Sequence, residues 1–114
     1  MKLLLTCEHG GNKVPSTYRS LFQDADTVLQ SHRGWDPGTL GLFDLLKEDA
    51  AAHFHSTISR LLVELNRSPH HPALFSRYTK SLPLQERKKL LERYYLPYRS
   101  VVEEHVFFLM IRRP

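Results

Sequence analysis

The sequence lacks the features that mark membrane and secreted proteins. No apolar run approaches the ~20 residues that a membrane-spanning helix needs, and the run at residues 3–5 is shorter than the roughly 7 to 15 apolar residues of a signal peptide. A single cysteine, Cys7, excludes an internal disulfide, which fits a reducing compartment. We therefore expect a cytoplasmic protein without a membrane partner.

Internal repeats and low-complexity segments are also missing from the sequence, and 114 residues suffice for one small domain at most. Hydrophobic residues make up 41% of the chain, enough for a core. The net charge of +4 would favour anionic ligands, from small carboxylates to nucleic acid. Charge alone does not choose among them.

A short apolar run near the amino terminus ends in a polar loop. The run has no helical period, which predicts a buried strand, and Cys7, Glu8, His9 and a glycine pair follow it. Glycine lets the backbone turn tightly and lets a ligand approach closely. Because α/β folds keep their sites at the carboxyl ends of strands, this loop is a candidate functional loop.

The remaining segments alternate between helix and strand patterns. We expect helices at 15–22, 37–48 and 84–95, with Pro97 kinking or interrupting the last one. Residues 58–65 are apolar and β-branched enough for an interior strand, and 52–56 have a shorter alternating pattern. This order predicts an α/β fold, with a mostly parallel or mixed sheet and flanking helices.

Three motifs in order, HGGNKVP at 9–15, HRGWDPG at 32–38 and SRLLVELNRSP at 59–69, closely resemble the N-formylglutamate amidohydrolase family. These are zinc-dependent hydrolases related to the zinc carboxypeptidases and to aspartoacylase. The resemblance covers most of residues 1–100. It implies an incomplete zinc carboxypeptidase-like fold, and a substrate that is a small acyl amino acid, cleaved at the N-acyl (N-formyl) amide, such as N-formylglutamate.

The resemblance also implies a zinc site, with His9 as the leading ligand; the alternative is a loop histidine that bonds nearby backbone. The related carboxypeptidases place a glutamate three residues later, where this chain has Asn12, an uncommon zinc ligand. Asp36 is the candidate that fills this gap, since a carboxylate at a helix start can turn toward a metal; a simple N-cap is the alternative. The general base and the third ligand are not assigned.

Asn66 and Arg67 match the Asn-Arg pair that the zinc carboxypeptidases use to hold the substrate. Arginine presents a planar fork to a carboxylate, and asparagine can donate to a second oxygen. The alternative for Arg67 is a surface salt bridge at a strand end. For Arg60, near the start of the same segment, we expect a pairing with a carboxylate elsewhere in the fold.

The sequence is also compatible with two other functions. The first is a small basic anion- or nucleic-acid-binding domain without catalysis that uses Arg87, Lys88, Lys89 and Arg93; the absence of an aromatic-basic RNA signature argues against nucleic acid. The second is a hydrolase with Cys7 as nucleophile, although a buried structural cysteine is commoner.

The end of the sequence leaves the family pattern. We expect residues 1–105 to be the amino-terminal part of an N-formylglutamate amidohydrolase-like domain and 106–114 to be a foreign tail. Residues 107–114, FFLMIRRP, resemble translated sequencing-adapter read-through. The chain would then be a fragment that binds zinc weakly and has little or no turnover alone.

Overall fold

The computed structural model describes residues 3–111, with side chains through Phe107, and has a mixed α/β fold. In chain order the elements are β1 (Leu4–Cys7), the 3-10 helix η1 (Ser16–Phe22), α1 (Asp26–Gln30), α2 (Thr39–Leu46), the 3-10 helix η2 (Lys47–Asp49), β2 (Ala52–His55), α3 (Leu84–Leu90), the π-helical η3 (Leu91–Tyr95) and α4 (Leu96–Ile111).

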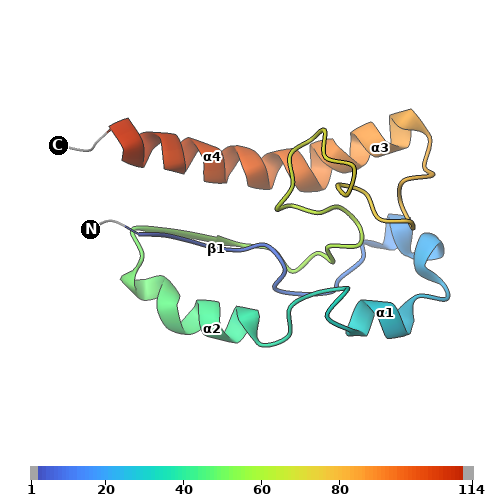
Figure 1. Ribbon diagram of the computed structural model, residues 1–114, viewed down its shortest axis with the longest axis horizontal. Helices are drawn as coiled ribbons and strands as arrows, with labels where there is room; N and C mark the ends of the chain where they lie inside the picture. The colour runs from blue at the N-terminus through green and yellow to red at the C-terminus, as the bar shows by residue number, and fades with distance from the viewer. Residues whose placement is uncertain (1–2, 112–114) are drawn as a thin grey trace.

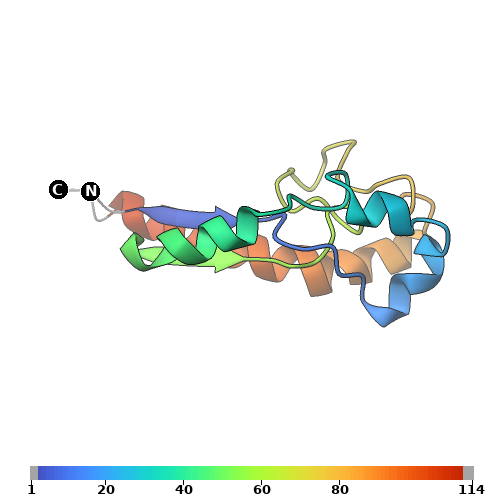
Figure 2. The same ribbon diagram turned by 90° about the horizontal axis from the view of Figure 1, so that it is seen from below.

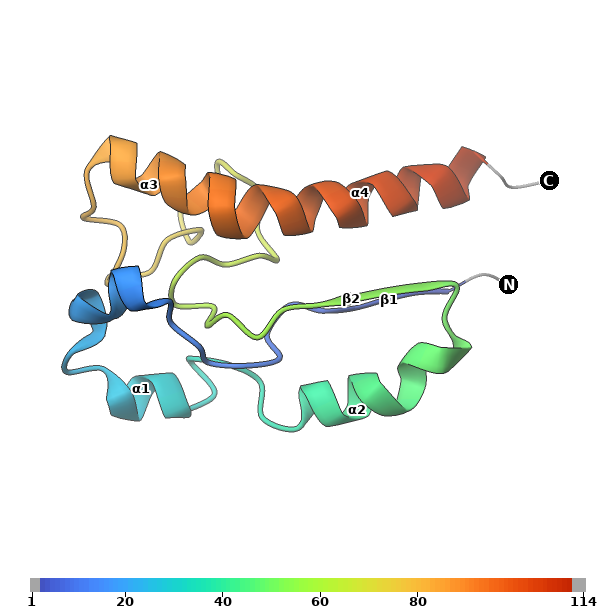
Figure 3. The ribbon, with the colours of Figure 1, turned by 180° about the vertical axis from the view of Figure 1, so that it is seen from behind.

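The two strands run parallel, with Leu4 beside Ala52 and Cys7 beside His55. A further parallel bridge joins Lys13 to Ile58, so the two chain segments stay together beyond the strands. Helix α4 lies along one face of this small sheet and α2 along the other (Figures 1 and 3). Viewed from the α2 side, β1 and β2 lie next to each other behind that helix (Figure 2). The predicted parallel arrangement with helical cover is confirmed.

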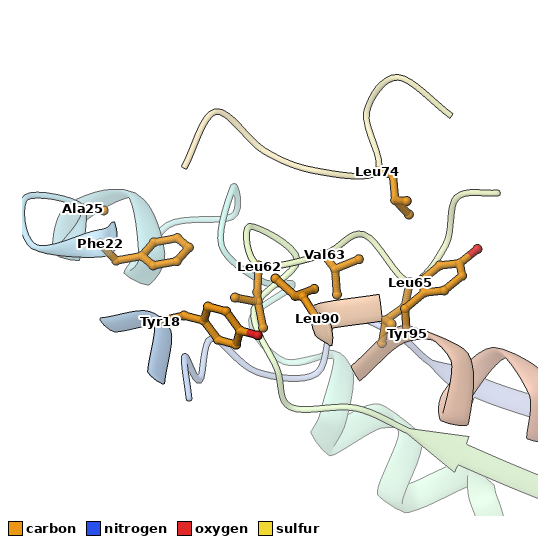
Figure 4. Close-up of a cluster of buried hydrophobic side chains, with 9 residues drawn as sticks. All are labelled: Tyr18, Phe22, Ala25, Leu62, Val63, Leu65, Leu74, Leu90 and Tyr95. Carbon is orange, nitrogen blue, oxygen red and sulfur yellow. The ribbon is translucent and has the colours of Figure 1, made fainter. Parts of the chain in front are cut away.

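The main hydrophobic core lies beyond the carboxyl ends of the strands, where the segment after β2 passes between η1 and the α3–η3 helix (Figure 4). Leu62 and Leu90 are completely buried at its centre, and the ring of Phe22 lies 5.0 Å from that of Tyr78. The buried members of the cluster are Tyr18, Phe22, Ala25, Leu62, Val63, Leu65, Leu74, Leu90 and Tyr95. This packing fixes the segment that carries the third sequence motif.

The predicted strand at 58–65 is wrong. Only Ile58 makes a sheet bridge, and the chain then turns, with Leu62 N–H donating to Ser59 O at 3.0 Å. Further along, Glu64 N–H donates to Leu74 O at 2.8 Å, so an irregular segment satisfies its backbone groups without a ladder. The apolar run reflects burial in the core, which periodicity alone does not distinguish from a strand.

The shorter pattern at 52–56 does form a strand, β2, over Ala52–His55. The helix expected at 37–48 begins at Thr39, after Gly38 in a left-handed conformation (φ 87°). The Pro97 interruption takes the form of η3, a π-helical segment directly before α4, so the helix continues past the proline without ending.

Helix α4 continues to Ile111, and residues 112–114 lie outside the described part of the chain. A foreign tail at 106–114 therefore stays a prediction. Within residues 3–111, no helix combines the length and apolar character needed to cross a membrane.

Candidate functional site

The loop after β1 carries His9 and is held against the chain that leaves β2. Gly10 N–H donates to Ser56 O at 3.0 Å, and Lys13 N–H donates to Thr57 O at the same distance. A Cβ at Gly11 would lie 2.6 Å from Thr57 O, closer than any side chain tolerates. The glycine pair is thus required by the close approach of two backbones, which places His9 at the carboxyl end of the sheet.

Both ring nitrogens of His9 face carboxylates. Nδ1 lies 3.2 Å from Oδ2 of Asp36, and Nε2 contacts Oε1 of Glu64. The backbone follows the same arrangement, since Asp36 N–H donates to His9 O at 2.9 Å. His9 and Asp36 were the two metal ligands predicted from the sequence. The structure brings them together although they lie 27 positions apart in the chain.

Asp36 does not cap the following helix. Gly38 occupies the N-cap position of α2, which has no side-chain cap hydrogen bond. The carboxylate of Asp36 instead lies between His9 and Arg60 and is 44% exposed. The capping alternative for Asp36 is thus not what the structure shows.

Arg60 closes a ring of charges around His9. Its Nη1 lies 3.3 Å from Oδ1 of Asp36, and its Nε and Nη2 each lie 3.2 Å from Oε2 of Glu64. Each carboxylate thereby gives one oxygen to the guanidinium and the other to the imidazole. The expected pairing of Arg60 with a distant carboxylate is confirmed, and the residue holds both acids in fixed orientations.

The electrostatics of the ring follow from these contacts. The hydrogen bond and charge of Glu64 raise the pKa of His9 above its usual 6.5, although burial opposes the rise. Burial would raise the pKa of Glu64, but the hydrogen bond and charge of His9, together with the Asn66 N–H and the charge of Arg60, outweigh it and bring that pKa below 4.5. Glu64 is only 7% exposed, so its charge depends on these partners.

Sequence reasoning missed Glu64 as a site residue. The signal that could have found it is a charged residue inside the apolar run LLVEL, since a buried carboxylate is rare unless it is paired. Val63 and Leu65 on either side point into the core (Figure 4), and Glu64 between them reaches the imidazole.

The predicted substrate-binding pair follows Glu64 directly. Asn66 N–H donates to Oε1 of Glu64 at 3.2 Å, and the carbonyl of Arg67 accepts from the Tyr95 hydroxyl at 2.7 Å. The backbone of this pair is thus fixed beside the site. Both side chains are exposed, and in the described part of the chain neither side chain makes a hydrogen bond or ion pair. They are accessible to a ligand, and their substrate role stays a prediction.

A second contact ties the loop to α4. The Tyr98 hydroxyl donates to Oε2 of Glu8 at 2.6 Å, and it lies 3.4 Å from Phe54 O. Burial and the hydrogen bond to Glu8 strongly raise the pKa of Tyr98, so the hydroxyl keeps its proton and remains a donor. A cavity of about 210 Å³ lies beside this pair, and Thr6 and Asn66 also line it.

Cys7 has the properties of a structural cysteine. It is 3% exposed, and burial together with the charges of Glu8 and Asp36 raises its pKa. A raised pKa disfavours the thiolate that a nucleophile requires.

The basic residues that could bind an anion, on the helix at 84–95, are partly engaged within the protein. Arg87 lies over the Phe75 ring, and Lys89 pairs with Glu86 at 3.5 Å.

The donors around His9 are of the kind that zinc takes in proteins, an imidazole nitrogen and carboxylate oxygens. The Nε2 side is enclosed by buried Glu64, while the Nδ1 side meets the partly exposed Asp36. Across residues 3–111, no three His, Cys, Asp or Glu side chains are arranged to hold a metal ion. His9 and Asp36 thus offer two donors of the right chemical type, and their role as zinc ligands stays a prediction.

Comparison with known proteins decides the family. The family model for N-formylglutamate amidohydrolase matches residues 1–107. The chain belongs to the N-formylglutamate amidohydrolase family. The family resemblance seen in the three sequence motifs is thus confirmed.

The fold of this amidohydrolase family member is similar to that in the crystal structure of a gene product from Agrobacterium tumefaciens. The TM-score is 0.77 at 33% sequence identity, over 90% of this chain and 44% of that one. The chain thus spans less than half the length of this relative. None of the curated proteins matches the chain.

Proposed function

We propose that this chain is the amino-terminal part of a cytoplasmic, zinc-dependent amidohydrolase with a zinc carboxypeptidase-like fold. It would cleave the N-acyl amide of an acidic amino acid, such as N-formylglutamate. Family membership supports the amidohydrolase class. The observation that carries the metal assignment is His9 held between Glu64 on one ring nitrogen and Asp36 on the other.

The orientation of His9 supports binding through Nδ1. A metal-ligating histidine usually donates its other N–H to a carboxylate, which fixes the ring and raises its basicity. Glu64 contacts Nε2 from the buried side and so serves as that orienting carboxylate. Nδ1 of His9 and the neighbouring carboxylate of Asp36 are then the two donors left for the metal. The metal would take the place of the proton in the hydrogen bond between them.

Arg60 keeps the two acids in their separate roles. Because it contacts the oxygens of Asp36 and Glu64 that do not face His9, neither carboxylate is free to rotate away from the ring. Asn66 and Arg67, whose side chains are free in the described part of the chain, would bind the carboxylate of the acidic substrate.

A zinc ion bound there would supply a Lewis acid for the acyl carbonyl and a lowered pKa for an attacking water. A catalytic zinc site takes three protein ligands. We propose that the third ligand and the general base come from the longer part of the family proteins that residues 1–107 do not span. The chain alone would then bind zinc weakly and have little or no turnover.

The test is zinc binding by calorimetry and elemental analysis, with formate release from N-formylglutamate measured in parallel. We expect weak zinc binding that is lost in His9→Ala and reduced in Asp36→Asn, and little or no formate. His70→Ala, an exposed loop histidine outside the site, is the matched control. Efficient turnover that survives His9→Ala, or zinc binding unchanged in both site variants, would defeat the proposal.

The substrate role of Arg67 has its own measurement, the binding of glutarate as a simple dicarboxylate. Arg67→Ala should weaken binding because the planar fork is lost, and Arg67→Lys should restore only part of it. Arg77→Ala is the control for general charge, since Arg77 is also exposed and lies on a different loop. Equal weakening in both variants would remove Arg67 from the site.

A further inference from the structure

Two histidines of β2 lie on one face of the sheet. Successive strand residues point to opposite faces, so His53 and His55 share a side and Phe54 takes the other. Both imidazoles pack against the same ring, Phe43 of α2, with centroid distances of 5.7 Å and 5.4 Å. Phe54 packs instead against His105 of α4, 4.8 Å away. The two imidazoles are therefore neighbours on the α2 side.

The nitrogens of this pair are available. In the described part of the chain, neither His53 nor His55 makes a side-chain hydrogen bond or ion pair, and both residues are exposed. Two other histidines are engaged, since Nδ1 of His71 accepts from Ala73 N–H at 2.9 Å and Nδ1 of His105 lies 2.9 Å from Val101 O, whereas His32 and His70 share the lack of such a bond within residues 3–111. The β2 pair thus keeps its lone pairs free for a ligand.

A groove lies beside β2 on the α4 side of the sheet, opposite the face to which the two imidazoles project. Among the described strands β2 pairs only with β1, and a groove of about 540 Å³ runs along β2 toward α4. His53, Phe54 and His55 all line this groove, with Arg93, Tyr94 and Pro97 on the helical side. The Arg93 side chain therefore lies on the α4 side of the sheet, while the imidazoles of His53 and His55 project toward α2.

We propose that His53 and His55 form a two-histidine site for a divalent transition metal, with Cu²⁺ bound more tightly than Ni²⁺ or Zn²⁺. Imidazole suits these three ions, and a two-nitrogen set completed by water accepts the tetragonal geometry of Cu²⁺, which also heads the affinity order. Because both histidines lie on one strand, the second metal–nitrogen bond forms within the same molecule. Its high effective concentration makes the pair bind more tightly than either histidine alone. The site uses no residue of the His9 cluster.

The test is Cu²⁺ titration of the whole chain, followed by calorimetry and by electron paramagnetic resonance. The wild-type spectrum should show imidazole nitrogen coupling. His53→Ala and His55→Ala should each weaken binding about tenfold or more, and the double variant should lose the site. His70→Ala is the matched control and should bind as the wild type does.

A measurement on the wild-type chain guards against a variant that fails to fold. Paramagnetic broadening of amide signals by Cu²⁺ should centre on His53, His55 and Phe43, and it should persist in Asp36→Asn, which alters only the His9 cluster. Broadening centred elsewhere, or unchanged affinity in the folded double variant, would overturn the site. Failure of the zinc assignment at His9 would leave this result unaffected.

Discussion

Glu64 contacts the imidazole of His9 from 55 positions away in the sequence, and it does so from within the hydrophobic core. Its neighbours Val63 and Leu65 are among the most buried side chains of the chain. The packing that buries these two residues therefore also aims the carboxylate. The site and the core are consequently one structural unit. A substitution at the site should therefore change the free energy of unfolding.

Replacing Glu64 tests this coupling. Glu64→Ala leaves His9 and Arg60 without their shared buried partner, so we expect a loss of about 2–4 kcal/mol in the free energy of unfolding. Glu64→Gln keeps an accepting oxygen and should cost less, about 1–2 kcal/mol. Urea unfolding gives both values, and the exposed Glu92→Ala should stay within about 0.5 kcal/mol of the wild type. A loss in Glu64→Ala no larger than in Glu92→Ala would show that the contact contributes little.

The stability of the metal-free chain should depend on pH through the same contact. The folded pKa of His9 is raised above 6.5, so its contribution is complete below that value and is lost as pH rises through the raised pKa. The folded pKa of Glu64 is lowered below 4.5, so its contribution is present above that value and is lost as pH falls through the lowered pKa. The pair therefore stabilises most between the two.

The measurement is urea unfolding in the presence of a chelator, from about pH 6 to about pH 9. The stability difference between the wild type and His9→Gln should shrink as pH rises across this range. Taking the difference from this variant isolates the contribution of the His9 contact. A difference that stays constant or grows with pH would contradict the raised pKa.

Much of the fold could be predicted from local patterns. The first strand, the glycine loop and the helices expected at 15–22, 37–48 and 84–95 follow from short-range signals, namely apolar runs, glycine pairs and helical spacing, whereas α1 was not among the expected helices. The conformation of the segment at 58–65 could not be predicted in this way. Its apolar residues belong to an irregular core segment whose backbone hydrogen-bonds to Leu74 and Lys13. Those partners are distant in the sequence, and single-sequence periodicity does not include them.

The candidate site divides in the same way. His9 and Asp36 stand at element boundaries beside glycines, where sequence patterns are informative, and the structure brings them within 3.2 Å of each other. Glu64 and Arg60 lie inside the segment whose conformation was mispredicted. Their roles depend on which way that segment turns, so they follow from tertiary packing and from no local motif.

The contact between Tyr98 and Glu8 should contribute to the stability of the His9 loop. Tyr98→Phe removes a hydrogen bond to a half-buried carboxylate, and we expect a loss of about 1.5–3 kcal/mol in the free energy of unfolding. Glu8→Gln should cost less, since the amide oxygen can still accept from the hydroxyl. Hydrogen exchange of the Gly10 and Lys13 amides should also speed up in Tyr98→Phe. Unchanged exchange would mean that α4 does not brace the loop.

Two glycines provide a final and opposed pair of predictions. A Cβ at Gly34 would lie 2.2 Å from Leu29 O, whereas one at Gly41 of α2 meets nothing within 4 Å. Gly34→Ala should therefore lower the free energy of unfolding by at least about 1–3 kcal/mol, because the backbone at Leu29 must move. Gly41→Ala should stabilise it by about 0.5–1 kcal/mol, because alanine favours the helix.

The position of Gly34 gives its variant a second consequence. Its carbonyl accepts from the Ser59 hydroxyl at 2.9 Å and from Arg60 N–H at 3.2 Å. A shift of this backbone should displace Arg60 and loosen both carboxylates around His9, so weak zinc binding should fall in Gly34→Ala and remain in Gly41→Ala. Zinc titration of the two folded variants provides the comparison. Equal zinc binding in both would mean that the Gly34 backbone does not position Arg60.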